Sequence, residues 1–150
     1  MFWHGIYNTV LSRVEAGGVG KTFLYYFDLD TEMNYVKNMF LQSIKADGAS
    51  HGDDIGYLFP PSLPGGKLPG IDSVEFALIK KMVAVVTSFI INGDPNSSGV
   101  LDSTWQPVSG KNHLECLHMA NDSFKLVQLP DEERFKALNE IFESVNVSTH

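Results

Sequence analysis

The spacing of apolar residues predicts three helices along the chain. The first covers residues 2–15, where the apolar positions are Phe2, Ile6, Val10, Leu11 and Val14. The second covers residues 72–91, with an apolar stripe made of Val74, Leu78, Met82, Val85 and Phe89. The third begins at Pro130 and Asp131 and has an inner face made of Phe135, Leu138, Ile141 and Phe142.

The ends of these helices carry ordinary stop and start residues. Gly17-Gly18 ends the first pattern, and Asp72 or Ser73 provides an N-cap for the second. The sequence Gly93-Asp94-Pro95-Asn96 ends that second helix, because glycine and proline both interrupt helical backbone. The middle helix is therefore the best defined of the three.

Three β-prone runs lie between the predicted helices. The run from Thr22 to Asp28 is nearly continuous, which is typical of a strand covered on both faces in a parallel α/β sheet. Residues 114–119 and 124–129 are separated by a four-residue polar turn and predict a hairpin. Residues 31–47 are mixed and predict no element, and a Pro/Gly-rich loop runs from Pro60 to Gly70. The pattern indicates an α/β fold.

Composition limits the classes of partner. The 150 residues fit one domain or part of a larger one, and a net charge of −7 argues against nucleic acid or an anionic membrane. The longest apolar run, Val83–Ile91, is too short to span a bilayer. Cys116 is the only cysteine, so no internal disulfide can form. The first residues carry no targeting signal, so a secreted and a cytoplasmic location are both compatible; the sequence gives no oligomeric state.

Three Asn-X-Ser sequons are present, at Asn96, Asn121 and Asn146. They are candidate glycosylation sites in a secreted protein. About one match is expected by chance in a chain of this kind, so the excess is only a mild indication of secretion.

Residues 16–22 (A-G-G-V-G-K-T) match the end of a phosphate-binding loop. Such a loop follows a strand and opens a helix, whereas here a predicted helix precedes and a predicted strand follows. The position of the loop's first glycine is occupied by Glu15, whose carboxylate repels phosphate. A flexible helix-to-strand turn is the better interpretation.

Residues 48–52 (G-A-S-H-G) match the G-x-S-x-G nucleophile elbow, in which a strand-to-helix turn exposes a serine. The preceding residues 42–47 do not read as a buried strand. A triad centred on Ser50 would need a downstream acid and histidine, such as Asp102 with His113 or His118, and these lie in a loop and a short hairpin. The sequence context therefore disfavours Ser50 as a nucleophile.

His51 is the stronger candidate for chemistry. Two glycines flank it and leave the imidazole unshielded, and the carboxylates of Asp53 and Asp54 follow closely. A loop histidine beside solvated aspartates is the structural alternative. A metal site is not expected, because no second histidine or cysteine lies at ligand spacing.

The segment Gly48–Phe59 (G-A-S-H-G-D-D-I-G-Y-L-F) resembles the catalytic-histidine segment of type-B carboxylesterases, the cholinesterase-related family of α/β-hydrolases. Neighbouring segments resemble the family in the same order, and insect general esterases are the most similar branch. They are the helix at Phe2–Ile6, the strand at Phe23–Phe27, the helix end at Phe89–Asn96, the loop at Trp105–Pro107, the hairpin and the helix at Glu133–Phe135. The resemblance covers essentially all 150 residues.

The resemblance implies a serine esterase that acts on small carboxylic esters through an acyl-enzyme and needs no cofactor. It implies His51 as general base and general acid, and Asp54 as a buried acidic residue that supports it. Residues 1–150 then form the C-terminal part of the domain: the last sheet strands, the catalytic-histidine loop, the packing helices and the terminal hairpin. The family's G-E-S-A-G nucleophile and its glutamate are expected upstream.

We expect the isolated chain to lack esterase activity for that reason. We also expect it to expose an unpaired strand edge and the apolar stripe of residues 72–91, both of which favour aggregation. The alternative from another class is a catalytically inactive family relative that serves adhesion or protein binding. An alanine or glycine in place of the upstream serine would favour it.

Overall fold

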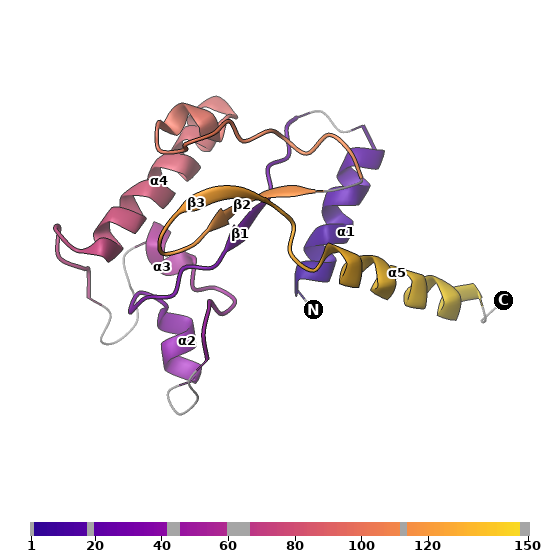
Figure 1. Ribbon diagram of the computed structural model, residues 1–150, viewed down its shortest axis with the longest axis horizontal. Helices are drawn as coiled ribbons and strands as arrows, with labels where there is room; N and C mark the ends of the chain where they lie inside the picture. Colours follow the sequence, from indigo (N-terminus) through magenta and orange to yellow (C-terminus); the bar gives the residue numbers. More distant parts are fainter. Residues whose placement is uncertain (1, 18–19, 42–45, 60–66, 112–113, 148–150) are drawn as a thin grey trace. The chain divides into compact units, whose positions relative to one another are not determined.

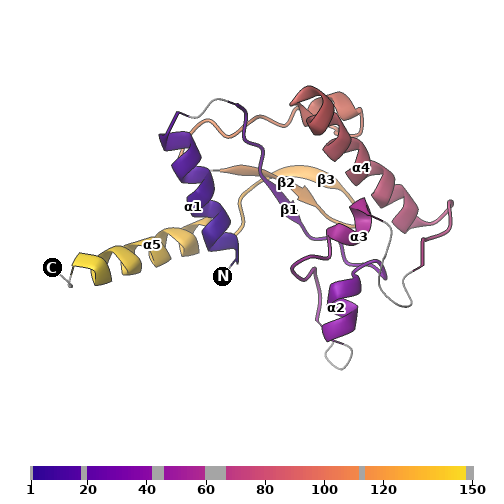
Figure 2. The same cartoon turned by 180° about the vertical axis from the view of Figure 1, so that it is seen from behind.

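A computed structural model describes residues 2–17, 20–41, 46–59, 67–111 and 114–147. The chain forms two compact units (Figure 1). The first comprises Met1–Leu24, Gln106–Cys116 and Leu126–His150, and the second comprises Tyr25–Trp105 and Leu117–Lys125. Figure 2 shows the same elements from behind.

The first unit contains the two terminal helices, α1 (Phe2–Glu15) and α5 (Glu132–Val147). Tyr7 and Val10 are buried on α1, and the Tyr7 ring packs on Phe135 of α5 with centroids 5.5 Å apart. An amide pair between Asn8 and Asn139 joins the same helices, with N···O distances of 3.0 and 2.8 Å. Both predicted helices are thus confirmed.

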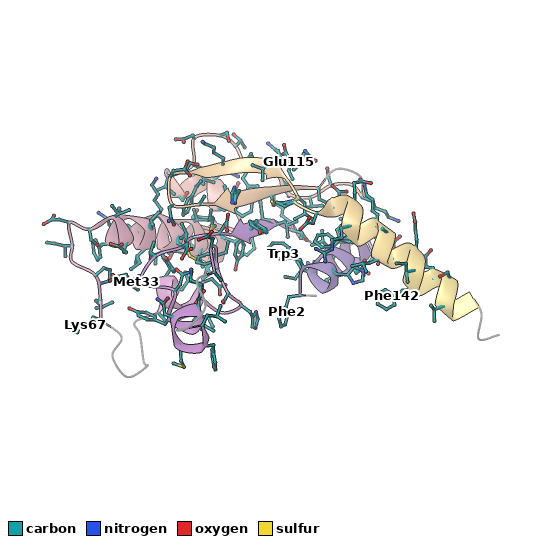
Figure 3. All side chains as sticks on the ribbon, turned by 60° about the horizontal axis from the view of Figure 1, so that its bottom comes forward. Phe2, Trp3, Met33, Lys67, Glu115 and Phe142 are labelled. Atoms are coloured by element: carbon teal, nitrogen blue, oxygen red, sulfur yellow. The ribbon has the colours of Figure 1, made fainter. Side chains whose placement is uncertain are left out.

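The predicted inner face of α5 is only partly correct. Phe135 is buried, but Ile141 and Phe142 are 58% and 57% exposed. The Phe142 ring stacks on the His4 ring, with the two ring centroids 5.6 Å apart. Figure 3 shows Phe2 and Phe142 projecting from their helices. Helix α1 covers the first half of α5 and contacts the second half through the His4–Phe142 pair, so most of the apolar surface of Ile141 and Phe142 stays exposed.

Three strands form one sheet in the order β1-β2-β3. Strand β1 (Tyr25–Phe27) pairs in parallel with β2 (Glu115–Met119), with Tyr26 opposite His118. Strand β3 (Phe124–Gln128) follows β2 through a turn closed by backbone bonds between Ala120 and Ser123. The hairpin is confirmed. The β1 strand is shorter than predicted, and Tyr25 remains 38% exposed.

Cys116 lies in β2 and is completely buried. Burial raises the pKa of its thiol to about 11, because a thiolate is costly away from water.

The main helix of the second unit is α4 (Val74–Asn92), as its apolar stripe predicted. Ser73 caps it, since the Ser73 hydroxyl accepts the Phe76 N–H at 3.1 Å, and Gly93 ends it with a left-handed φ of 64°. The buried stripe is Leu78, Met82 and Val85. Val74 and Phe89, at its ends, are 64% and 42% exposed. The central part of the stripe therefore forms the core contact.

Three short helices complete the second unit. They are α2 (Tyr35–Phe40), α3 (Ile55–Leu58) and the 3-10 helix η1 (Pro95–Ser98), and both α3 and η1 pack against α4. Helix α2 falls in the stretch 31–47, where the sequence pattern predicted no element. The loop predicted over residues 60–70 lies outside the described residues from 60 to 66; residues 67–70 have no regular structure.

No helix in the described ranges is long and apolar enough to cross a membrane.

Candidate functional site

A tight turn presents His51. The turn closes between Ser50 and Asp53, where the Asp53 N–H donates to the Ser50 carbonyl at 3.1 Å. His51 and Gly52 are its two middle residues, and Gly52 has a φ of +88°, a left-handed value that glycine adopts without strain. His51 is exposed at this turn, directly before helix α3. The turn therefore holds an imidazole where a partner can reach it.

Asp53 is the buried acid of the site, with a relative exposure of 1%. Its carboxylate accepts the Ser50 N–H at 2.7 Å, the Lys37 N–H at 3.0 Å and an Asn34 side-chain N–H at 3.2 Å. The Lys37 amide is in the first turn of α2, where backbone N–H groups have no partner within the helix. The carboxylate thus joins the His51 turn to α2.

Asp54 is only partly buried, which differs from the expectation of a buried acid at this position. Asp53, the last residue of the turn, is buried, whereas Asp54 is partly exposed. The Tyr25 hydroxyl donates to Asp54 at 3.2 Å. Burial, and next the negative charge of Asp54, raises the pKa of Tyr25 to about 12, so Tyr25 is a neutral donor at neutral pH.

Behind Asp53 lies a fully buried amide. Asn34 donates to the Leu29 carbonyl at 2.7 Å as well as to Asp53. Its oxygen accepts the Thr31 N–H at 3.0 Å and the Tyr57 hydroxyl at 3.0 Å, so all four hydrogen-bonding positions of the amide are filled. Burial raises the pKa of Tyr57 to about 12 and keeps this hydroxyl protonated. Such a satisfied network fixes the side chains around it.

The chain before the turn is held by an ion pair. Lys37 pairs with Asp30, and the Lys37 ammonium also donates to the Gly48 carbonyl at 2.8 Å. The other Asp30 oxygen accepts the Gly48 N–H at 2.8 Å, so both backbone groups of Gly48 are bound. The hairpin turn joins this network, because the Asn121 side chain exchanges two hydrogen bonds with the backbone of Asp30.

Sequence reasoning missed Asn34, Lys37 and Asp30, and gave Asp54 the support role without weighing Asp53 against it. Two signals were available. In a four-residue turn such as Ser50–Asp53, the fourth residue approaches the first. Asp53, and not Asp54, is therefore the carboxylate placed to bond back to Ser50. The polar residues of 30–37 had no helical or strand pattern to explain them.

Replacing Gly52 by alanine should destabilise the fold by about 1–2 kcal/mol, because a β-carbon is strained at a left-handed φ. The added atom would meet only ordinary contacts, the closest being Val36 at 3.5 Å. Urea unfolding measures this cost. The matched control is Gly5→Ala within α1, which has open space around it and should gain about 0.5–1 kcal/mol. Equal effects of the two changes would contradict the turn geometry.

The disfavoured elbow does not form in the described residues. Residues 46–50 are irregular, and Ser50 enters a turn rather than following a strand. Asp102 is exposed in a loop, and His118 of β2 is hydrogen-bonded at 2.9 Å to Asp28, the residue after β1. His113 lies outside the described residues. The described residues thus give no support to a triad centred on Ser50.

The phosphate-loop match also lacks its required context. Helix α1 precedes it and β1 follows it, the reverse of the order such a loop needs. Gly18 and Val19 lie outside the described residues.

The sequons differ in their surroundings. The Asn96 side-chain amide donates to the Asp94 carboxylate at 2.7 Å and to the Trp105 carbonyl at 2.9 Å. Its oxygen accepts the Trp105 N–H at 2.7 Å. A glycan on Asn96 would replace one of the donated amide hydrogens. Asn121 is exposed, and its amide donates to the Asp30 carbonyl at 2.8 Å. The Asn146 side chain lies outside the described part. Glycosylation of all three stays a prediction.

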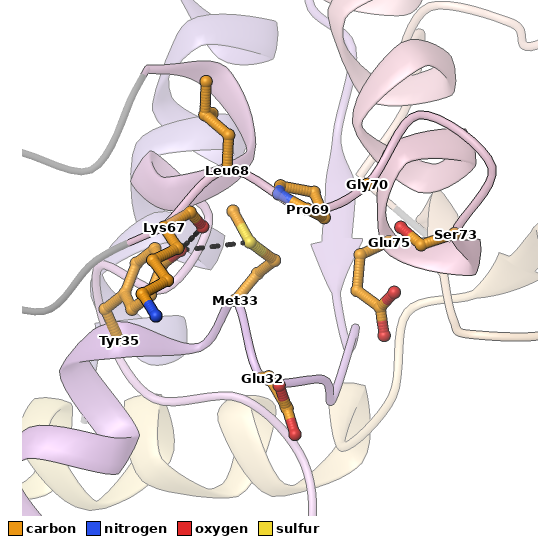
Figure 4. Close-up of a pocket in the computed structure, with 9 residues that line it drawn as sticks. All are labelled: Glu32, Met33, Tyr35, Lys67, Leu68, Pro69, Gly70, Ser73 and Glu75. Atoms are coloured by element: carbon orange, nitrogen blue, oxygen red, sulfur yellow. Dashed lines mark hydrogen bonds between the residues drawn. The ribbon is translucent and has the colours of Figure 1, made fainter.

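A pocket of about 520 Å³ lies elsewhere in the second unit, and His51 is not among its lining residues. Figure 4 shows Met33 and Tyr35 on one side, with the Tyr35 hydroxyl donating to the Lys67 carbonyl at 2.8 Å, and Glu32 and Glu75 nearby. Among the described residues, no group of three or more histidine, cysteine or acidic side chains is arranged to hold a metal ion.

Comparison with known proteins decides the family. The model of the carboxylesterase family matches residues 1–137. The chain belongs to the carboxylesterase family. Esterase B1 of Culex pipiens is 34% identical over 141 residues, an alignment that covers 89% of this chain and 25% of that protein. This carboxylesterase chain therefore spans about a quarter of the length of the curated relative it matches.

Membership in the type-B carboxylesterases identifies the fold as that of the α/β-hydrolases. The insect branch indicated by the sequence is consistent with the Culex relative. The small sheet with a parallel pair, flanked by helices, is compatible with that fold.

Proposed function

We propose that this chain supplies the proton-transferring histidine of a serine carboxylesterase, and that this histidine is His51. The observation that carries the proposal is the turn Ser50–Asp53, which exposes His51 while a buried carboxylate holds the turn. A general base needs access to its substrate and a fixed position. The family membership supplies the reaction class.

In the proposed mechanism His51 takes the proton of the nucleophilic serine during acylation and returns it to the leaving alcohol. The substrate is a small carboxylic ester, and the acyl-enzyme route uses no metal or cofactor. Asp54, with its Tyr25 contact, is proposed to support this histidine in the complete site. The acid that orients the imidazole is proposed to be a glutamate upstream.

We further propose that residues 1–150 are the C-terminal segment of the esterase domain. In α/β-hydrolases the triad residues follow the chain order serine, acid, histidine. If His51 is the third member, the other two precede it; residues 1–50 contain no G-E-S-A-G elbow, so we place the nucleophile and its glutamate upstream of residue 1. The match to a quarter of a longer esterase supports this arrangement.

The 150-residue chain by itself is therefore expected to be inactive. Without the serine there is no covalent route, and without the oxyanion hole the residual catalysis of a damaged triad is lost as well. We expect no turnover of a short-chain nitrophenyl ester and no labelling by a fluorophosphonate, which modifies activated serines.

The decisive experiment compares this chain with the protein encoded by the complete transcript. An upstream G-E-S-A-G that a fluorophosphonate labels would support the proposal. Turnover by the isolated chain that disappears in His51→Ala would contradict its inactivity. An alanine or glycine at the upstream serine would contradict the esterase proposal and favour the adhesion alternative.

A further inference from the structure

We propose that Asp53 is the positioning residue of His51: its buried carboxylate fixes the turn that presents the imidazole. The proposal relies on the proposed function only for its kinetic consequence. The positioning itself is a property of the described residues.

The first argument is the pattern of donors around Asp53. Its carboxylate accepts the N–H of Ser50, the residue before His51, while the Asp53 N–H donates back to the Ser50 carbonyl. The two bonds close a ring around His51 and Gly52. Because His51 is a member of this ring, the ring fixes the backbone position from which its side chain projects.

The second argument is that the ring is anchored. The same carboxylate accepts the Lys37 N–H of α2 and the buried Asn34 amide, so the turn cannot move without breaking charge-assisted bonds in the interior. A buried carboxylate that loses its donors is costly, which makes the arrangement rigid. Lys37 contributes twice, since its ammonium also holds Gly48 ahead of the turn.

The third argument separates Asp53 from its neighbour. Asp54 is chemically identical and one residue away, but it accepts a hydrogen bond from the Tyr25 hydroxyl at 3.2 Å and not from the backbone of the turn. Asp53 is 1% exposed and Asp54 is partly exposed. The chain therefore offers a matched pair of aspartates for the experiment.

The experiment uses Asp53→Asn and Asp54→Asn in the full 150-residue chain. Asparagine keeps the shape but places an NH₂ group against at least one donor. Amide hydrogen exchange of Ser50 is read by NMR, with the His51 and Gly52 resonances as reporters of the turn. We expect Ser50 exchange to become roughly tenfold faster or more in Asp53→Asn and to change less than about twofold in Asp54→Asn.

Unchanged Ser50 exchange in Asp53→Asn, or an equal increase in both variants, would overturn the proposal. Resonances of α4, which belongs to the same compact unit as the turn, report whether each variant still folds. If a variant does not fold, a measurement on the unmodified chain still tests the proposal. The Ser50 and Lys37 amide protons, which share the Asp53 carboxylate, must both be protected from exchange in the unmodified chain. A freely exchanging Ser50 amide there would also overturn the proposal.

A kinetic readout in the complete esterase tests the consequence for catalysis. We expect Asp53→Asn to lower kcat by roughly 10- to 100-fold with little change in KM, because misplacing a base impairs the chemical step rather than binding. If faster Ser50 exchange leaves kcat unchanged, Asp53 still positions the turn and the proposed role of His51 is wrong. If kcat falls with unchanged exchange, the positioning inference is wrong.

Discussion

Replacing His51 by glutamine in the complete esterase is expected to lower kcat for ester hydrolysis by roughly 10⁴-fold or more. Glutamine keeps hydrogen-bonding groups but cannot carry a proton between serine and leaving group. The lost function is therefore proton transfer, which acts in the transition state, so KM should change much less than kcat. Steady-state hydrolysis of a nitrophenyl ester measures both parameters.

His118→Gln is the matched control for that experiment. His118 also contacts an aspartate, Asp28 at 2.9 Å, but it lies in β2 on a different segment from the His51 turn. We expect this variant to retain kcat within about threefold, since it changes a partly exposed hydrogen bond of small energetic weight. A large loss in His118→Gln with a small loss in His51→Gln would reverse the assignment of the two histidines.

Truncating Met82 to alanine is expected to destabilise the fold by about 2–5 kcal/mol. Met82 is completely buried on α4 between Leu78 and Val85, so the change removes apolar contacts and leaves a cavity. A cost of this size is a large part of the stability of a typical domain. Urea unfolding followed by circular dichroism measures it.

Ile91→Ala on the same helix is the control. Ile91 is 73% exposed, so its truncation should change the free energy of unfolding by less than about 0.5 kcal/mol. The pair separates core packing from helix propensity, because both changes place alanine in α4. A larger cost for Ile91 than for Met82 would mean that the helix buries the opposite face.

The elements that the sequence predicted well are those whose signals are local. Helix α4 has its cap, its apolar stripe and its terminal glycine within one continuous segment, and the hairpin has its turn between two β-prone runs. Strand β1 was predicted too long because an apolar run does not show how far its partner extends. The outer half of α5 was predicted to be buried because periodicity identifies an apolar face, whereas burial needs a neighbour.

The residues of the candidate site also divide into those that local sequence signals predicted and those that they did not. His51 could be found from its flanking glycines and from the resemblance to carboxylesterases. The support of the turn could not, because it depends on Asn34 and Lys37, which are more than ten residues away in the chain and meet Asp53 only in three dimensions. Choosing between Asp53 and Asp54 requires the direction of each side chain, which a pair of identical residues does not reveal.

The buried position of Cys116 makes its thiol a probe of local unfolding. Its thiol is fully covered in the middle strand of the sheet, and burial raises its pKa to about 11. Because the thiolate is the reactive form, an alkylating reagent modifies this cysteine only in molecules whose central strand has opened. As the chain has no other cysteine, the labelling rate counts those openings alone.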